Sequence, residues 1–169
     1  DLYRALAADS QRYTTSNTRP ESLMAGAWLI REGADVVQDL LAANRTTMET
    51  WRYQNLIRSR STCIGKFLFS VMEPQDYLQQ GLDETAAREN VFALSGCAEV
   101  KIWALFTRCA DGSFAASLRS RQLEVRDIAE TFGGGGHICA AGIKGLDNGQ
   151  LTELIAALAK RSLEQPAAD

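Results

Sequence analysis

The chain has 169 residues, of which 46% are hydrophobic and 23% are charged, and its formal net charge is −3. This balance excludes a broad basic surface that holds nucleic acid by phosphate neutralisation alone. No apolar run approaches the roughly 18 residues of a membrane span, so no membrane partner is expected. The sequence starts without a signal-peptide pattern. It also starts without Met, and we expect the natural protein to extend further upstream.

The cysteine and histidine content argues against a structural zinc site. His137 is the only histidine, and no two cysteines form a C-x-x-C pair. We interpret the four cysteines as reduced thiols that behave as small hydrophobic residues, which favours a cytoplasmic protein. They are Cys63, Cys97, Cys109 and Cys139.

The first sixty residues are predicted to be helical. Residues 18–21, Thr-Arg-Pro-Glu, have the pattern of a capping box. Apolar residues then recur at helical spacing over 23–34, and Gly33 predicts the end of that helix. A further helix is expected over 47–58.

This helical segment is too short to form a complete domain. We therefore predict a boundary near residues 58–62, between a helical segment over 1–60 and an α+β unit over 61–165. The second unit is long enough to form its own core.

The next elements follow from a change of period and from capping residues. Alternation from Cys63 to Val71 predicts one strand, which Pro74 ends. Asp83 is expected to cap a helix that runs through Leu94. The inward face of that helix is Ala87, Val91 and Leu94.

Two further strands are predicted around a hairpin at Asp111-Gly112. The first covers residues 100–107, and the second begins at Phe114. A short helix over 125–131, a strand near Ile143 and a last helix capped near Asp147 or Asn148 complete the pattern. The predicted fold class is α/β in the broad sense (α+β), with a small mixed sheet flanked by helices.

Residues 133–142, Gly-Gly-Gly-Gly-His-Ile-Cys-Ala-Ala-Gly, carry the strongest functional signal. Consecutive glycines let backbone N–H groups approach a ligand and form a concave anion site. We expect a short helix starting near His137, with its N-terminus aimed at that anion. His137 itself could donate to a phosphate oxygen or stack on a base. The alternative is a flexible connection in which Gly133 merely ends a helix and His137 is exposed by chance.

Polar residues on the strand that begins at Phe114 strengthen the anion hypothesis. Ser117 and Arg119 share one strand face, because residues two apart point the same way. A guanidinium matches the oxygens of a phosphate. Arg121 has the same parity and lies near the strand end. A solvated arginine is the alternative for each of these positions, but serine, arginine, glycines and histidine together favour phosphate binding.

Three segments together carry a family resemblance. S-L-R-S at 117–120, V-R-D-I-A-E-T-F at 125–132 and G-G-G-G-H-x-x-A-A-G at 133–142 resemble the DHHA1 domain of the DHH phosphoesterase family. Upstream, residues 2–13 resemble the last motif of the DHH catalytic domain, and the helix ending in Gly-Ala-Asp at 33–35 fits the same region.

The resemblance implies a division of roles between two domains. In this family the DHH domain holds two divalent metals, generally manganese, which activate a water for attack on phosphorus. By matching position, Asp9 would be a metal ligand. The DHHA1 domain binds the phosphate or nucleotide end of the substrate, with Ser117, Arg119, Arg121, Gly134, Gly135, Gly136 and His137 as the expected binding residues.

The sequence also departs from the family pattern. The Asp-His-His motif is absent, and Asp9 is followed by Ser-Gln where the family has Thr-Gly. One carboxylate cannot hold a two-metal centre. We therefore expect this chain alone to be inactive and to work with an upstream DHH domain.

Several functions remain open at this level. In short members of the family the substrates are very short RNA oligonucleotides, phosphoadenosine phosphate or cyclic dinucleotides, so the expected partner is a short RNA or DNA oligonucleotide or a phosphorylated nucleotide. The alternatives are a tRNA-type binding module without chemistry of its own and a purely structural or oligomerisation domain. Whether the protein is a homodimer is open.

Overall fold

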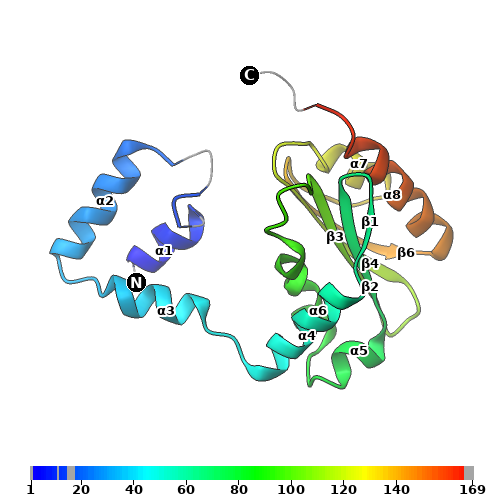
Figure 1. Ribbon diagram of the computed structural model, residues 1–169, viewed down its shortest axis with the longest axis horizontal. Helices are drawn as coiled ribbons and strands as arrows, with labels where there is room; N and C mark the ends of the chain where they lie inside the picture. Colours follow the sequence, from blue (N-terminus) through cyan, green and yellow to red (C-terminus); the bar gives the residue numbers. More distant parts are fainter. Residues whose placement is uncertain (1, 11, 15–17, 166–169) are drawn as a thin grey trace. The chain divides into compact units, whose positions relative to one another are not determined.

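The computed structural model describes residues 2–10, 12–14 and 18–165. The chain divides into two compact units, Asp1–Thr46 and Thr47–Asp169. The first unit consists of helices, shown in blue and cyan in Figure 1. They are α1 (Leu2–Asp9), α2 (Pro20–Arg31) and α3 (Val36–Asn44).

Helix α2 ends as predicted but begins differently. Its N-cap is Arg19, whose backbone N–H donates to Ser22 Oγ at 3.4 Å. The expected capping box at residues 18–21 is therefore wrong, and Thr18 Oγ1 is buried without a hydrogen-bond partner among the residues that the structure describes. Gly33 follows the C-cap with φ of 95°, a conformation that glycine adopts without steric cost.

The second unit is a six-stranded mixed sheet with helices on both faces, which confirms the predicted fold class. Its elements are α4 (Met48–Ser59), β1 (Thr62–Ile64), β2 (Phe67–Met72), α5 (Pro74–Leu78), α6 (Glu84–Glu89), the 3₁₀ turn η1 (Asn90–Leu94), β3 (Ile102–Arg108), β4 (Phe114–Ser120), α7 (Arg126–Thr131), β5 (Gly135–His137), β6 (Ala140–Leu146) and α8 (Asn148–Arg161).

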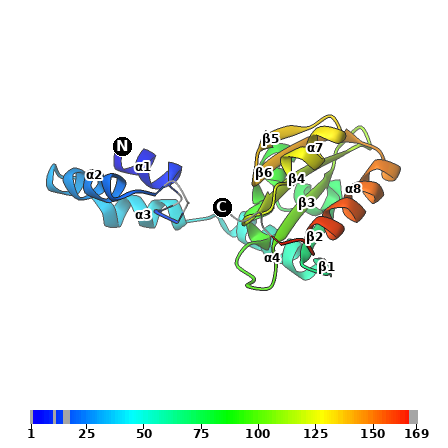
Figure 2. The same cartoon turned by 90° about the horizontal axis from the view of Figure 1, so that it is seen from above.

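The strands lie in the order β1-β2-β3-β4-β6-β5, which can be followed from bottom to top in Figure 2. Strands β2 and β3 are parallel, and every other neighbouring pair is antiparallel.

Helix α4 belongs to the second unit, so the first unit ends at Thr46 in the sequence, whereas we expected a boundary near residues 58–62. The physical reason is burial: Tyr53 and Ile57 are completely buried among residues of the sheet and of η1. Thr47 caps the helix, and its Oγ1 accepts from the N–H of Thr50 at 3.2 Å.

The single strand expected from Cys63 to Val71 is wrong, because the chain turns at Gly65. Gly65 has φ of 61°, and Ile64 pairs with Phe67 across a two-residue hairpin turn. The alternation from Cys63 to Val71 runs without a break through this turn, so the sequence pattern does not show it.

Capping residues at later helices are confirmed. Asp83 accepts from the N–H of Ala86 at 2.7 Å, and Asp147 accepts from the N–H of Gln150 at 2.8 Å. The helix expected through Leu94 has two parts, α6 and the tighter turn η1.

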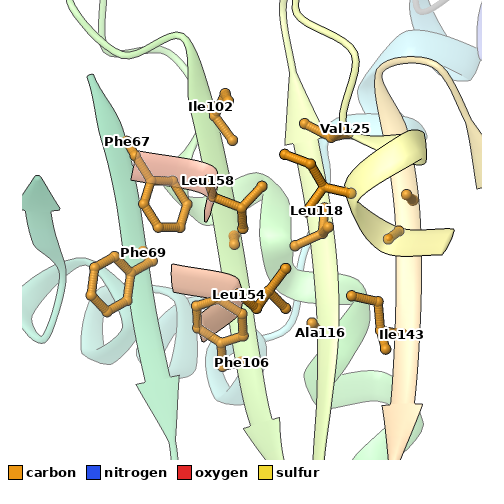
Figure 3. Packing of buried hydrophobic residues seen from close by; sticks show 14 of the residues in the cluster. Phe67, Phe69, Ile102, Phe106, Ala116, Leu118, Val125, Ile143, Leu154 and Leu158 are labelled. Atoms are coloured by element: carbon orange, nitrogen blue, oxygen red, sulfur yellow. The ribbon is translucent and has the colours of Figure 1, made fainter. Parts of the chain in front are cut away.

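Each face of the sheet has its own hydrophobic core. One face packs against α7 and α8, and Figure 3 shows Leu154 and Leu158 of α8 over the aromatic rings of β2 and β3. The other face packs against α4, α5, α6 and η1, around Leu105 and Met72 (Figure 1). No helix in the described part of the chain is long and apolar enough to cross a membrane.

Candidate functional site

The second face of the sheet is covered by helices at β2 and β3, while residues of β6 and β5 on that face stay open. Strand register places one row of residues across this open part. Arg119 pairs with Ala140 on β6, and Ala140 pairs with His137 on β5. Directly paired residues point to the same face, so the side chains of Arg119 and His137 lie on the same side of the sheet. Their backbones are separated by two strand spacings, about 10 Å.

A second row lies beside the first. Ser117 pairs with Gly142, and Gly142 pairs with Gly135. Gly142 is exposed, and Gly135 and Ala140 are partly exposed. Because the residues between Ser117, Arg119 and His137 are glycine or alanine, the surface between the three polar side chains is made largely of backbone.

The glycine segment is a β-hairpin, so the short helix expected near His137 is wrong. Residues 135–137 are strand β5, and the chain turns at Ile138-Cys139 into β6. Glycines give no hydrophobic pattern from which a strand could be predicted, and hydrogen bonding to β6 is what makes this segment a strand. His137 is therefore aimed by strand geometry and not by a helix terminus.

Gly133 ends helix α7. It has φ of 75°, and its N–H donates to Glu130 O at 3.1 Å, while the N–H of Gly134 donates to Ala129 O at 2.9 Å. These two bonds form a Schellman motif. The alternative interpretation of the sequence is thus right that Gly133 ends a helix, but the segment after it is a paired strand and not a flexible connection.

The remaining glycines fall into two classes. A Cβ on Gly134 would lie 2.6 Å from Ile143 Cγ1, and a Cβ on Gly136 would lie 2.8 Å from Ala141 Cα, so packing against β6 requires both. A Cβ on Gly135 would meet nothing within 4 Å, and on Gly142 it would make only ordinary contact. The two glycines on the open face are therefore not required by packing, and their missing side chains leave room for a ligand.

Arg119 places a guanidinium on this surface. Its guanidinium donates to Leu118 O at 2.8 Å and lies 5.6 Å from the ring centroid of Phe92. No carboxylate of the described residues forms an ion pair with it. Burial lowers the pKa of Arg119, because removal from water disfavours the charged form. An anion placed beside this guanidinium would compensate that cost.

The helical wall of the site comes from α6 and η1. Ser117 Oγ donates to Arg88 O at 3.3 Å, which ties β4 to the end of α6. Phe92 follows on η1 and contacts Arg119. Sequence reasoning missed Phe92, although an aromatic residue between inward-facing Val91 and Leu94 was a usable signal.

Arg121 lies one residue beyond the end of β4. Its guanidinium donates to Cys97 O at 2.9 Å, and its side chain lines a small hollow of about 200 Å³ with Lys101 and Leu123. The structure thus brings Ser117, Arg119 and His137 to one face, and gives Arg121 a separate contact at the strand end.

Asp9 is the exposed last residue of α1, in the first unit. Across residues 2–10, 12–14 and 18–165, no three His, Cys, Asp or Glu side chains are grouped so that they could hold a metal ion. The residues described here do not fit a two-metal centre, and we derive no chemical step through metals in this chain. All four cysteines are free thiols.

A comparison with models of known protein families identifies the family of the second unit. The model of the DHHA1 domain matches residues 65–163, a range that contains β4, the glycine hairpin and α8. The chain belongs to the DHHA1 domain family. The family resemblance inferred from the sequence motifs is confirmed.

Curated relatives are longer than this chain. It is 31% identical over 165 residues to the bifunctional oligoribonuclease and PAP phosphatase NrnA of Mycoplasma genitalium, covering 95% of this chain and 50% of the relative. It is 27% identical over 144 residues to the protein of the same name from Mycoplasma pneumoniae, covering 83% and 43%. The chain spans about half the length of these relatives.

A solved structure shares the fold. An exopolyphosphatase-related protein from Bacteroides fragilis matches with a TM-score of 0.77 and 17% sequence identity, over 92% of this chain and 46% of that chain. At this identity the likeness shows the fold alone.

Proposed function

We propose that this chain is the substrate-binding C-terminal part of a metal-dependent phosphoesterase that hydrolyses short oligonucleotides or phosphorylated nucleotides. The observation that carries the proposal is Arg119, a partly buried guanidinium that forms no ion pair with a carboxylate of the described residues and lies on an open sheet face with His137. The names of the Mycoplasma relatives, which combine oligoribonuclease and PAP phosphatase, support this class of substrate.

In this proposal Arg119 supplies the fixed positive charge for a substrate phosphate. His137 donates a hydrogen bond from the neighbouring part of the same face, and the backbone of Gly135 and Gly142 lets the ligand approach closely. The net charge of −3 favours a small phosphorylated ligand, because a long polymer held by counterion release needs a more extended basic surface.

The hydrolytic step belongs, in the same proposal, to divalent metals, manganese in particular, held by a DHH domain of the whole protein. Asp9 would contribute one ligand to that centre. A cytoplasmic setting, in keeping with the four free thiols, is part of the proposal. This chain alone is then a binding unit without turnover.

The test is calorimetric titration of the chain with the 5′-phosphorylated diribonucleotide pApA, referred to below as 5′-phosphorylated diadenosine. Arg119→Ala should weaken binding by about 1.5–3 kcal/mol, the range for hydrogen bonds to charged groups, and His137→Ala should weaken it as well. Arg52→Ala, an exposed arginine on α4, is the charge-matched control and should bind like the unsubstituted chain. Circular dichroism would check that each variant is folded.

Unchanged affinity in Arg119→Ala would remove Arg119 from the site. A second arm adds manganese and follows phosphate release, and the expected result is no appreciable hydrolysis by this chain. Robust metal-dependent turnover would contradict the assignment of the metal centre to another part of the protein.

A further inference from the structure

Phe92 is an exposed aromatic side chain on a rigidly held turn. Its side chain is 55% exposed, while the other four residues of η1 are buried. The carbonyl of Phe92 accepts from both the N–H of Ser95 at 3.0 Å and Ser95 Oγ at 2.7 Å. Asn90 accepts from Gln54 Nε2 at 2.9 Å and donates to Ala86 O at 2.8 Å. The turn is therefore fixed by hydrogen bonds on both sides of Phe92, and Phe92 is the exposed residue of this turn.

The position of Phe92 distinguishes it from the other exposed aromatic residues. Trp51 on α4 is exposed to a similar degree, 53%, but no cation–π contact involves it among the described residues. Phe92 instead lies against the guanidinium of Arg119, the cation that lacks a carboxylate partner. An aromatic ring and a planar cation in contact, both partly accessible, form a surface on which a flat ring can stack.

A second aromatic residue neighbours Arg119 on the adjacent strand β3. Trp103 on β3 pairs directly with Arg119, and its indole N–H is buried without a hydrogen-bond partner in the part of the chain that the structure describes. Aromatic groups thus flank Arg119 on two sides, whereas on the third side the row continues through Ala140 to His137. Trp103 packs against the core around Leu105 and Met72, so Phe92 is the aromatic residue of this group for which a bound phosphate alone gives no reason.

We propose that Phe92 is the residue on which a nucleobase of the substrate stacks, beside the phosphate that Arg119 holds. This inference rests on the proposed function and makes it more specific. It assigns the ligand class as phosphates that carry an aromatic base next to the bound phosphate, because inorganic phosphate, polyphosphate and sugar phosphates have no group that can use Phe92. The chain would then select nucleotides through Phe92 and bind their charge through Arg119.

The experiment compares two probes that differ in the base. The first is 5′-phosphorylated diadenosine, and the second is ribose 5-phosphate, which keeps the phosphate and sugar. Phe92→Ala should weaken binding of the first probe about 5- to 150-fold, the range expected for loss of one base–aromatic stack. Binding of ribose 5-phosphate should change less than about twofold, since its phosphate contacts stay in place.

Two variants guard against a misleading loss of structure. Phe92→Trp keeps a stacking ring and should retain the affinity for the dinucleotide within a few-fold. Trp51→Ala removes an aromatic side chain of matching exposure outside the site and should leave both affinities unchanged. Thermal unfolding of each variant confirms that the second unit remains folded.

The outcomes separate this inference from the proposed function. Equal losses for both probes in Phe92→Ala would show that the ring only positions Arg119, and no loss for the dinucleotide would remove Phe92 from the site, so either result overturns the inference. If Arg119→Ala weakens both probes while Phe92→Ala weakens neither, the proposed function stands and only the stacking role fails. If the unsubstituted chain binds neither probe, both are overturned.

Discussion

The two faces of strands β4 and β6 are built from alternate residues of the same short segments, yet they differ in burial and in polarity. On one face, Ala116, Leu118 and Ile143 are buried beneath α7 and α8 (Figure 3). On the other face, Arg119 and Gly142 are at least partly accessible. Neighbouring residues thus point into environments of opposite polarity.

This difference separates stability from binding at the level of single residues. The covered face supplies the buried apolar area that holds the sheet and its helices together. The open face carries the guanidinium of Arg119, which has no carboxylate partner within the described ranges and is available to an anion. We therefore expect substitutions on the covered face to change the free energy of unfolding and substitutions on the open face to change ligand affinity.

The largest effect is expected for Leu118→Ala on the covered face. Leu118 is fully buried, and truncation of a buried leucine costs about 2–5 kcal/mol through lost apolar burial and the cavity left behind. The preceding residue, Ser117, loses only its hydrogen bond to Arg88 O when changed to alanine, which costs at most about 1.5 kcal/mol. Urea unfolding of both variants measures the comparison. A greater loss for Ser117→Ala than for Leu118→Ala would contradict it.

The next effect concerns two adjacent glycines on opposite faces. Gly134→Ala should lower the free energy of unfolding by about 1–3 kcal/mol, because its Cβ would overlap Gly142 O and Ile143. Gly135→Ala meets no atom within 4 Å and should leave stability unchanged or raise it by up to about 1 kcal/mol. The same methyl group would project from the open face and should weaken binding of 5′-phosphorylated diadenosine. Denaturation together with calorimetry checks both halves, and equal destabilisation by the two variants would break the comparison.

The smallest effect is expected for an ion pair between the two helices that cover the first face, which adds slightly to the free energy of unfolding. Arg161 of α8 donates to Asp127 of α7 at 2.7 Å and 3.1 Å, and these hydrogen bonds lower the pKa of Asp127 in the folded chain. A lowered folded pKa stabilises the fold at pH values above the unfolded pKa of about 3.9, and this stability is lost as the pH falls through the folded pKa. Because nearly half of the Asp127 side chain is exposed, the contribution should be only about 0.5 kcal/mol.

The measurement for this pair is the difference in unfolding free energy between the chain and Asp127→Asn. The difference should be present at pH 7 and should shrink as the pH is lowered toward 3. Arg126→Gln is the control and should show a smaller difference, because it alters the ion pair with Glu130 on the same helix, in which both side chains are more exposed. A difference that grows on acidification would mean that Asp127 acts in another way.

Much of the site follows from local pattern. Ser117 and Arg119 alternate with the apolar residues Ala116 and Leu118, so the sequence predicts that these two polar groups share a face, and the structure bears that out. Asp83 and Asp147 predict helix starts because their side chains bond to nearby backbone groups.

The remainder depends on pairing between distant segments. Gly135 and Gly136 have no side chains to show a period, so only their hydrogen-bonded partners on β6 make them a strand. Gly65 was hidden for a similar reason, since alternation ran through the turn that it makes. The local pattern around Phe92 indicates an outward-facing aromatic residue, but its contact with Arg119 depends on the fold, which brings two distant parts of the sequence together.

The unequal anchoring of Arg119 and His137 has a consequence for local opening. Arg119 lies on β4, which is bonded to strands on both sides, whereas His137 lies on the three-residue strand β5, which is bonded only to β6. Strands at a sheet edge open more readily than central strands in amide hydrogen exchange. A phosphate that contacts both residues would fasten the edge strand to the centre of the sheet. Ligand binding would thus slow exchange at the amides of β5 while leaving those of β4 almost unchanged.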